Sequence, residues 1–125
     1  EWGRGGSNDS DAIGLPRALE VDSLDRVYVL EGSIGKVVVF DTSGNFVKTI
    51  WKDASGNSYF VNPRNMTIGD QILFIADQMQ IHAFDSAGNF VTKWGNNNFY
   101  DILALPDGQI WASVLSEQKV YRFQR

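Results

Sequence analysis

The 125-residue sequence contains no cysteine, only three prolines and a single histidine, His82. Without cysteine the chain can form neither a disulfide nor a thiolate metal site, and it has no cysteine nucleophile. Basic residues number 11 against 15 acidic ones, and no segment concentrates them, so nucleic acid is not an expected partner. No run approaches the roughly 20 apolar residues that cross a bilayer, so we expect no membrane insertion.

The composition is that of a globular domain. Hydrophobic residues make up 43% of the sequence, aromatic residues 13% and charged residues 21%. This balance differs from that of disordered chains, and the length allows one domain with a sizeable core.

The sequence contains internal repeats with a period of roughly 40 to 46 residues. Residues 39–47 read VFDTSGNFV and residues 83–91 read AFDSAGNFV. A weaker third copy ends the chain. Further pairs on the same period are Pro16-Arg17 with Pro63-Arg64, 27–31 with 73–77, and 37–40 with 120–123.

Each copy predicts short strands rather than helices. The apolar runs are rich in β-branched and aromatic residues and are bounded by Gly, Asp, Asn or Ser. Helical spacing of Ile72, Ile75, Met79 and His82 offers an alternative, but the equivalent residues of the first copy read as strands. The predicted strands of that copy are 18–21, 26–30, 36–40 and 46–51.

The third strands do not alternate polar with apolar residues, and residues 37–40 are apolar throughout, which predicts burial on both faces. Small antiparallel sheets stacked face to face around an axis bury strands in this way. The sequence therefore predicts an all-β fold, a β-propeller of four-stranded antiparallel blades.

At this point the residues resemble those of the NHL-repeat β-propeller family. The resemblance is strong for residues 1–95 and implies blades of about 40 to 45 residues, usually six in a ring. The family includes binding scaffolds, an amidating lyase and RNA-binding modules, so the resemblance implies fold more than activity. The motifs that carry it are Trp2-Gly3, Pro16-Arg17, Tyr28-Val29, Val39-Phe40-Asp41, Gly44-Asn45-Phe46 and Trp94-Gly95.

The resemblance divides the chain into a blade tail at 1–3, blade one at 16–51, blade two at 63–95 and an incomplete blade three at 99–125. Three blades cannot close a ring. We therefore expect the partner of this chain to be either the remaining blades of a larger propeller or a second copy of the chain.

Two groups of residues are candidates for ligand binding. Arg17 and Arg64 begin equivalent innermost strands, so their guanidinium groups are expected to meet at the mouth of the central channel and bind a carboxylate or phosphate. Asn97, Phe99 and Tyr100 replace a Gly-rich loop and are expected to form an exposed contact loop for peptide or glycan.

Other conspicuous residues have structural interpretations. Asp41 and Asp85 begin equivalent turns, and Glu31 and Asp77 are expected to hydrogen-bond neighbouring loops. His82 is expected to pack between blades. The aromatic sets Trp2, Trp51 and Trp94, and Tyr28, Phe74 and Trp111, are expected to fill equivalent core positions. Asn8, Asp9 and Asp11 lack an EF-hand pattern and are expected to form a solvated loop.

The predicted function is a non-enzymatic propeller scaffold that binds a protein, peptide or glycan, outside the cytoplasm by analogy with similar proteins. The sequence assembles no catalytic residues, no metal site and no cofactor loop. The alternative is a metal-dependent lyase or lactonase whose active site is completed by blades outside this chain.

Overall fold

A computed structural model describes residues 13–124 of the chain. The expected blade tail at 1–3, with Trp2, and the loop residues Asn8, Asp9 and Asp11 lie outside the described residues.

The described residues form three antiparallel sheets, which keep the names of the predicted blades. Blade one contains β1 (Pro16–Val21), β2 (Val27–Glu31), β3 (Lys36–Phe40) and β4 (Phe46–Ile50). Blade two contains β5 (Asn65–Gly69), β6 (Ile72–Ala76), β7 (Ile81–Phe84) and β8 (Phe90–Trp94). Blade three contains β9 (Asp101–Ala104), β10 (Gln109–Val114), the 3-10 helix η1 (Leu115–Glu117) and β11 (Lys119–Gln124).

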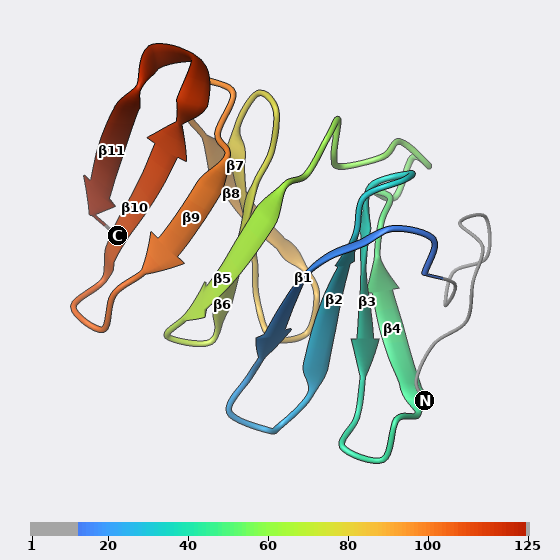
Figure 1. The fold of residues 1–125 in the computed structure, drawn as a ribbon. Coiled ribbons are helices and arrows are strands. Elements are labelled where there is room, and N and C mark those ends of the chain that lie inside the picture. Colours follow the sequence, from blue (N-terminus) through green and yellow to red (C-terminus); the bar gives the residue numbers. More distant parts are fainter. Residues whose placement is uncertain (1–12, 125) are drawn as a thin grey trace.

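The three blades stand side by side like the leaves of a fan (Figure 1). The first strands are the innermost, since β1 lies against β5 and β5 against β9. In each blade consecutive strands are neighbours, so each sheet is a simple meander. Because the equivalent strands run in the same direction, the starts of β1, β5 and β9 come together at one end of the fan.

The third strands of blades one and two are buried on both faces, as predicted, whereas the residues of β11, the third strand of blade three, are exposed or half-buried. All residues of β3 and β7 are buried, including Lys36 and His82. The buried Lys36 was not expected; its Nζ atom lies 5.1 Å from the centre of the Trp51 ring. His82 packs edge-on against Phe60, with 5.3 Å between ring centres, which confirms its place between blades.

Two apolar clusters join the blades. The cluster between blades one and two contains Tyr28, Leu30, Val37, Val39 and Ile50 of blade one and Met66, Leu73, Ile75 and Phe84 of blade two, with Phe60 from the connection. The cluster between blades two and three contains Phe74, Ala76, Ile81 and Ala83 of blade two and Ile102, Ile110, Ala112 and Val114 of blade three, with Phe99 from the connection. Burial of such surface at about 25 cal/mol per Å² is the main force that holds the fan together.

The Asp-x-x-Gly-Asn turns have the structural role that the sequence predicts. Asp41 Oδ1 accepts hydrogen bonds from the backbone N–H groups of Ser43 and Asn45, both at 2.9 Å, and Gly44 has a φ of 84°. Asp85 repeats this arrangement. Asp53 begins a third turn of this kind, in the connection between blades one and two. Sequence analysis did not identify it, although residues 53–57 have the same Asp-x-x-Gly-Asn pattern.

The expected equivalence of Trp51 and Trp94 is wrong by one residue. Trp94 pairs with Ile81, and the residue that pairs with the equivalent Val37 is Ile50. Because a shift of one residue turns a side chain to the other face of a strand, Ile50 and Trp94 enter the core and Trp51 does not.

Candidate functional site

The start of the first strands carries the candidate site. Arg17 and Arg64 line one hollow of about 520 Å³, as expected from their equivalent positions. We call it the mouth hollow. Its lining residues are Arg17, Asn62, Arg64, Asn65, Tyr100 and Asp101.

Arg17 is held across the blade boundary by the segment that leads into blade two. Its Nη1 atom donates hydrogen bonds to Asn62 Oδ1 at 2.8 Å and to the carbonyl oxygen of Pro63 at 2.9 Å. Gly32 lies beside the guanidinium, and a Cβ atom there would collide with it. Arg17 is thus oriented by neutral acceptors, while its side chain stays exposed.

Arg64 packs on Tyr100 of the next blade, with its Cζ atom 5.2 Å from the ring centre. The two residues are equivalent: Arg64 N–H donates to Ala76 O at 2.9 Å, and Tyr100 N–H donates to Ser113 O at 2.8 Å. Tyrosine therefore stands in blade three where blades one and two have arginine. This substitution was not recognised in the sequence.

One carboxylate completes the lining. Asp101 Oδ1 accepts hydrogen bonds from the Asn65 side-chain amide and, at 2.8 Å, from the backbone N–H of Ile102. Asp101 therefore bridges the starts of β5 and β9 rather than pairing with either arginine of the hollow.

The lead-in segment that holds Arg17 is itself fixed by Asp77. The Asp77 carboxylate accepts hydrogen bonds from the N–H groups of Val61 at 2.9 Å and Asn62 at 2.6 Å, and contacts His82 Nε2 at 3.1 Å. Burial raises the pKa of Asp77, but the hydrogen bonds from His82 and the backbone outweigh burial and hold the pKa below its ordinary value. The buried Asp77 of blade two thus positions the lead-in segment, which accepts the hydrogen bonds of Arg17.

Glu31 has the same role in blade one, as the sequence predicts. Its Oε1 atom accepts hydrogen bonds from the N–H groups of Leu15 at 3.0 Å and Ser33 at 2.7 Å. Burial acts to raise its pKa, and the hydrogen bonds from Ser33, Leu15 and Ile34 lower it further than burial raises it.

The expected contact loop is only partly exposed. Tyr100 is 48% exposed, but Phe99 is completely buried in the cluster between blades two and three. Asn97 is half-buried. The expectation that Phe99 is a surface contact is therefore wrong, because its ring packs edge-on against Tyr121 and Phe123.

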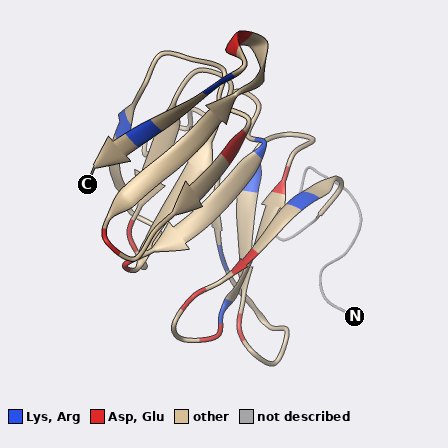
Figure 2. Cartoon of the chain, turned by 60° about the vertical axis from the view of Figure 1, so that its left-hand side comes forward, with Lys and Arg blue, Asp and Glu red and all other residues tan. Residues whose placement is uncertain are grey.

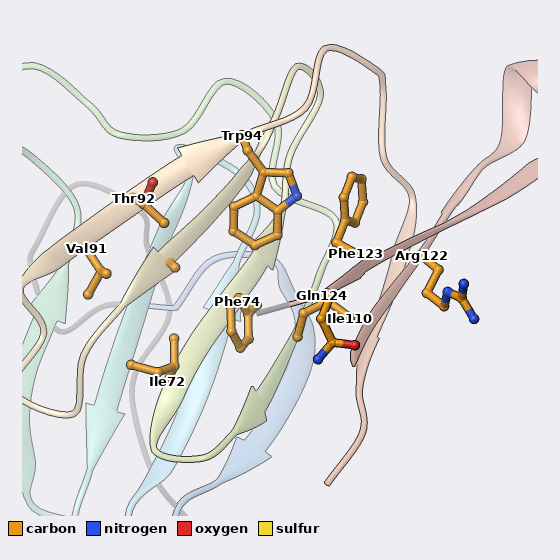
Figure 3. Close-up of a pocket in the computed structure, with 10 residues that line it drawn as sticks. Ile72, Phe74, Val91, Thr92, Trp94, Ile110, Arg122, Phe123 and Gln124 are labelled. Carbon is orange, nitrogen blue, oxygen red and sulfur yellow. The ribbon is translucent and has the colours of Figure 1, made fainter. Parts of the chain in front are cut away.

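A second hollow, an apolar groove of about 570 Å³, lies between blades two and three. Trp94, Phe74 and Phe123 gather along it and the Arg122 side chain points away from the rings (Figure 3). Sequence analysis did not identify this groove, because its lining residues read only as core positions.

The described residues contain neither a cluster of metal ligands nor a membrane-spanning helix. No group of three or more His, Cys, Asp and Glu side chains is close enough within residues 13–124 to hold a metal ion. No helix in this part of the chain is long and apolar enough to span a membrane. Figure 2 shows Lys and Arg interspersed with Asp and Glu along the chain.

The arrangement of blades is found in solved structures. A candidate exported protein of Bacteroides fragilis superposes with a TM-score of 0.73 at 17% identity, over 99% of this chain and 38% of that one. Virginiamycin B lyase of Staphylococcus aureus gives 0.65 at 13% identity, over 88% and 41%. A chain of the nidogen/laminin complex gives 0.61 at 14% identity, over 86% and 47%. These neighbours are β-propellers.

The chain has the β-propeller fold. It spans less than half the length of each of these three proteins. No family model matches the sequence, and no curated protein matches it. At identities of 13 to 17% the likeness concerns the propeller fold alone.

Proposed function

We propose that this propeller chain is a non-enzymatic binding module and that the mouth hollow holds part of a protein, peptide or glycan ligand. The observation that carries the proposal is the meeting of equivalent residues of three blades, Arg17, Arg64 and Tyr100, in or at the edge of one hollow. Propeller scaffolds present ligand-binding groups at strand ends in this manner, and a hollow of this size suits a small ligand group.

Peptide and glycan arrays probed with the labelled chain test this function. We expect ligands that bind the unaltered chain and lose binding when Arg17→Ala and Arg64→Ala are combined. Arg122→Ala removes an arginine outside the mouth hollow and is the matched control. Ligands that bind the double variant as well as the unaltered chain would contradict the proposal, provided that circular dichroism confirms folding of each variant.

We also propose that the blades are of NHL type. The support is the Gly-Asn-Phe segment that begins β4 and β8 and the acid, Glu31 or Asp77, that follows the second strand and fixes the lead-in segment. A longer polypeptide with further repeats of this pattern is the test.

The outer face of blade three supports the proposal that a further blade covers it. Trp111 is 39% exposed there, whereas the equivalent Tyr28 and Phe74 are 3% and 1% exposed beneath the next blade. The covering blade belongs either to the rest of a larger ring or to a second copy of the chain. Light scattering distinguishes them: a folded species of twice the chain mass indicates self-association, and a folded monomer contradicts the need for a cover.

A location outside the cytoplasm remains our proposal. Its support is the similarity in fold to the candidate exported protein of Bacteroides fragilis. Cell fractionation with an antibody against the chain tests it, and recovery in the cytosolic fraction would contradict it.

The alternative function is a propeller enzyme of the lyase or lactonase type, with a metal site completed by other blades. It is favoured by the fold similarity to virginiamycin B lyase and to a streptogramin B lyase, the latter with a TM-score of 0.65. Elemental analysis of the intact ring decides between the two, since a stoichiometric divalent metal would support the enzyme.

A further inference from the structure

The charge of the mouth hollow restricts what it can bind. Arg17 and Arg64 contribute two positive charges and Asp101 one negative charge, so the lining carries a net charge of about +1. We propose that the mouth hollow recognises a singly charged carboxylate group. This inference rests on the proposed binding function and names the chemistry of its ligand.

Arg17 supplies a preorganised set of donors. Only its Nη1 atom is used in the described structure, in the bonds to Asn62 and Pro63, and these fix the plane of the guanidinium. The planar fork of a guanidinium can then present its remaining N–H groups to a carboxylate in a bidentate manner. A side chain already held in place loses less conformational entropy when the ligand binds.

Arg64 supplies the second set. Its guanidinium packs on the face of Tyr100, and a guanidinium stacked on a ring keeps its in-plane N–H groups available for an acceptor. Neither Arg64 nor Arg17 forms a salt bridge with an acidic side chain of residues 13–124. A ligand carboxylate would therefore provide the acceptor that the described part of the chain does not.

Asp101 makes the hollow selective between anions. A phosphate monoester carries a charge of about −1.5 to −2 at neutral pH, so it costs more to desolvate than a single charge, and because Asp101 cancels one arginine the lining has a net charge of only about +1 to offset that cost. A carboxylate carries one negative charge, which balances the lining. The hollow of about 520 Å³ also leaves space for the group that bears the carboxylate, beside the exposed Tyr100 ring.

Calorimetry with matched small probes tests the inference. The probes are N-acetylalanine and its amide, glucuronic acid and glucose, and methyl phosphate. We expect each acid to bind about tenfold or more tightly than its neutral partner, and methyl phosphate to bind more weakly than the better acid. Binding should weaken as salt is raised. Whichever acid binds more tightly identifies the source as a peptide C-terminus or an acidic sugar.

Three variants connect the binding to the hollow. Arg17→Ala should abolish acid binding, Arg17→Lys should retain a weakened part because it keeps the charge but not the fork, and Arg122→Ala should leave binding unchanged. Equal binding of acid and neutral probes, tighter binding of methyl phosphate, or absence of binding by both acids would overturn the inference.

The two proposals fail in different ways. An array ligand that is neutral, and whose binding depends on Arg17 and Arg64, would leave the binding function in place and remove the carboxylate inference. An array ligand that is indifferent to both arginines would remove the mouth hollow as the binding site.

Discussion

Arg64 and Tyr100 occupy equivalent positions in neighbouring blades and also contact each other, with 5.2 Å between the guanidinium carbon and the ring centre. A residue of one blade thus meets its own counterpart in the next. Arg17 instead reaches the lead-in segment of blade two, through Asn62 and Pro63. The same position is therefore used in two ways within one chain.

Two substitutions of Tyr100 distinguish the contribution of its ring to stability from that of its hydroxyl group. Tyr100→Phe keeps the aromatic face and should leave stability nearly unchanged, whereas Tyr100→Leu should cost about 0.5–1 kcal/mol because the cation–π contact with Arg64 is lost. Urea denaturation measures both. A double-mutant cycle with Arg64→Ala should yield a coupling energy of similar size, and a cycle without coupling would contradict the contact.

Gly69→Ala should destabilise the boundary between blades two and three. A Cβ atom at Gly69 would lie 2.6 Å from the Cβ atom of Ala104 on the first strand of blade three. Neither group is flexible, so the strands must move apart, at a cost of about 1–3 kcal/mol. Thermal unfolding measures this, and an unchanged midpoint would mean that the blades are less closely packed than described.

Gly32→Ala should weaken carboxylate binding and leave the stability of the fold nearly unchanged. The added Cβ atom would meet the Arg17 side chain, which can swing away, so stability should change little. Carboxylate binding should nevertheless fall, because Arg17 leaves its position on Asn62 and Pro63. Calorimetry and thermal unfolding of the same sample separate the two effects, and full retention of binding would show that the orientation of Arg17 is unimportant.

Asp77 should make the fold sensitive to acid. Its pKa is lower in the folded state than the unfolded value of about 3.9, so the unfolded state takes up the proton first as pH falls. The stabilisation is present above about pH 4 and is lost as pH falls through the lower, folded pKa. Asp77→Asn should reduce stability at neutral pH by about 1–3 kcal/mol and flatten the acid dependence. Asp25→Asn, at an exposed turn, is the control; equal acid profiles for both variants would refute the assignment.

Tyr28 should limit stability in alkali. Burial, followed by the hydrogen bond that its hydroxyl donates to Asp22 and the charge of Asp22, raises the pKa of Tyr28 to about 12. The unfolded tyrosine loses its proton near pH 10, so the contribution of Tyr28 is complete below pH ~10 and is lost as pH rises toward about 12. Absorbance titration should show a late ionisation phase toward about pH 12 that Tyr28→Phe removes. Because the hydrogen bond to Glu117 also raises the pKa of Tyr121, Tyr121→Phe is the control and should leave the phase near pH 12 in place.

The sequence was sufficient for the blades because each blade repeats the same local signals. Asp41 and Asp85 begin the same turns, and the uniformly apolar 37–40 could only be a strand covered on both faces. The prediction that Trp51 is equivalent to Trp94 was wrong because it rested on the identity of the two residues. The strand register makes Ile50 the equivalent of Trp94.

Only some of the residues that line the mouth hollow could be predicted from the sequence. Arg17 and Arg64 were found because they follow prolines at equivalent places, but Tyr100 differs in chemistry and was assigned to a loop. Asn62 and Asp101 gain their roles from contacts between blades, which a repeat pattern within one blade does not encode. Phe99 reads as exposed beside three asparagines, and only the packing of blade three shows that it is buried.

Because Arg17, Arg64 and Tyr100 are equivalent, the mouth hollow of this propeller is assembled from the same position of each blade. Each blade contributes one side chain from the equivalent position to the mouth hollow, and the clusters that join the blades are formed by other residues. A substitution at this position can change one blade at a time, for example from an arginine to a tyrosine, while the interior remains the same. Under the proposed binding function, each added blade would therefore supply one more position that can vary independently, without any new fold being required.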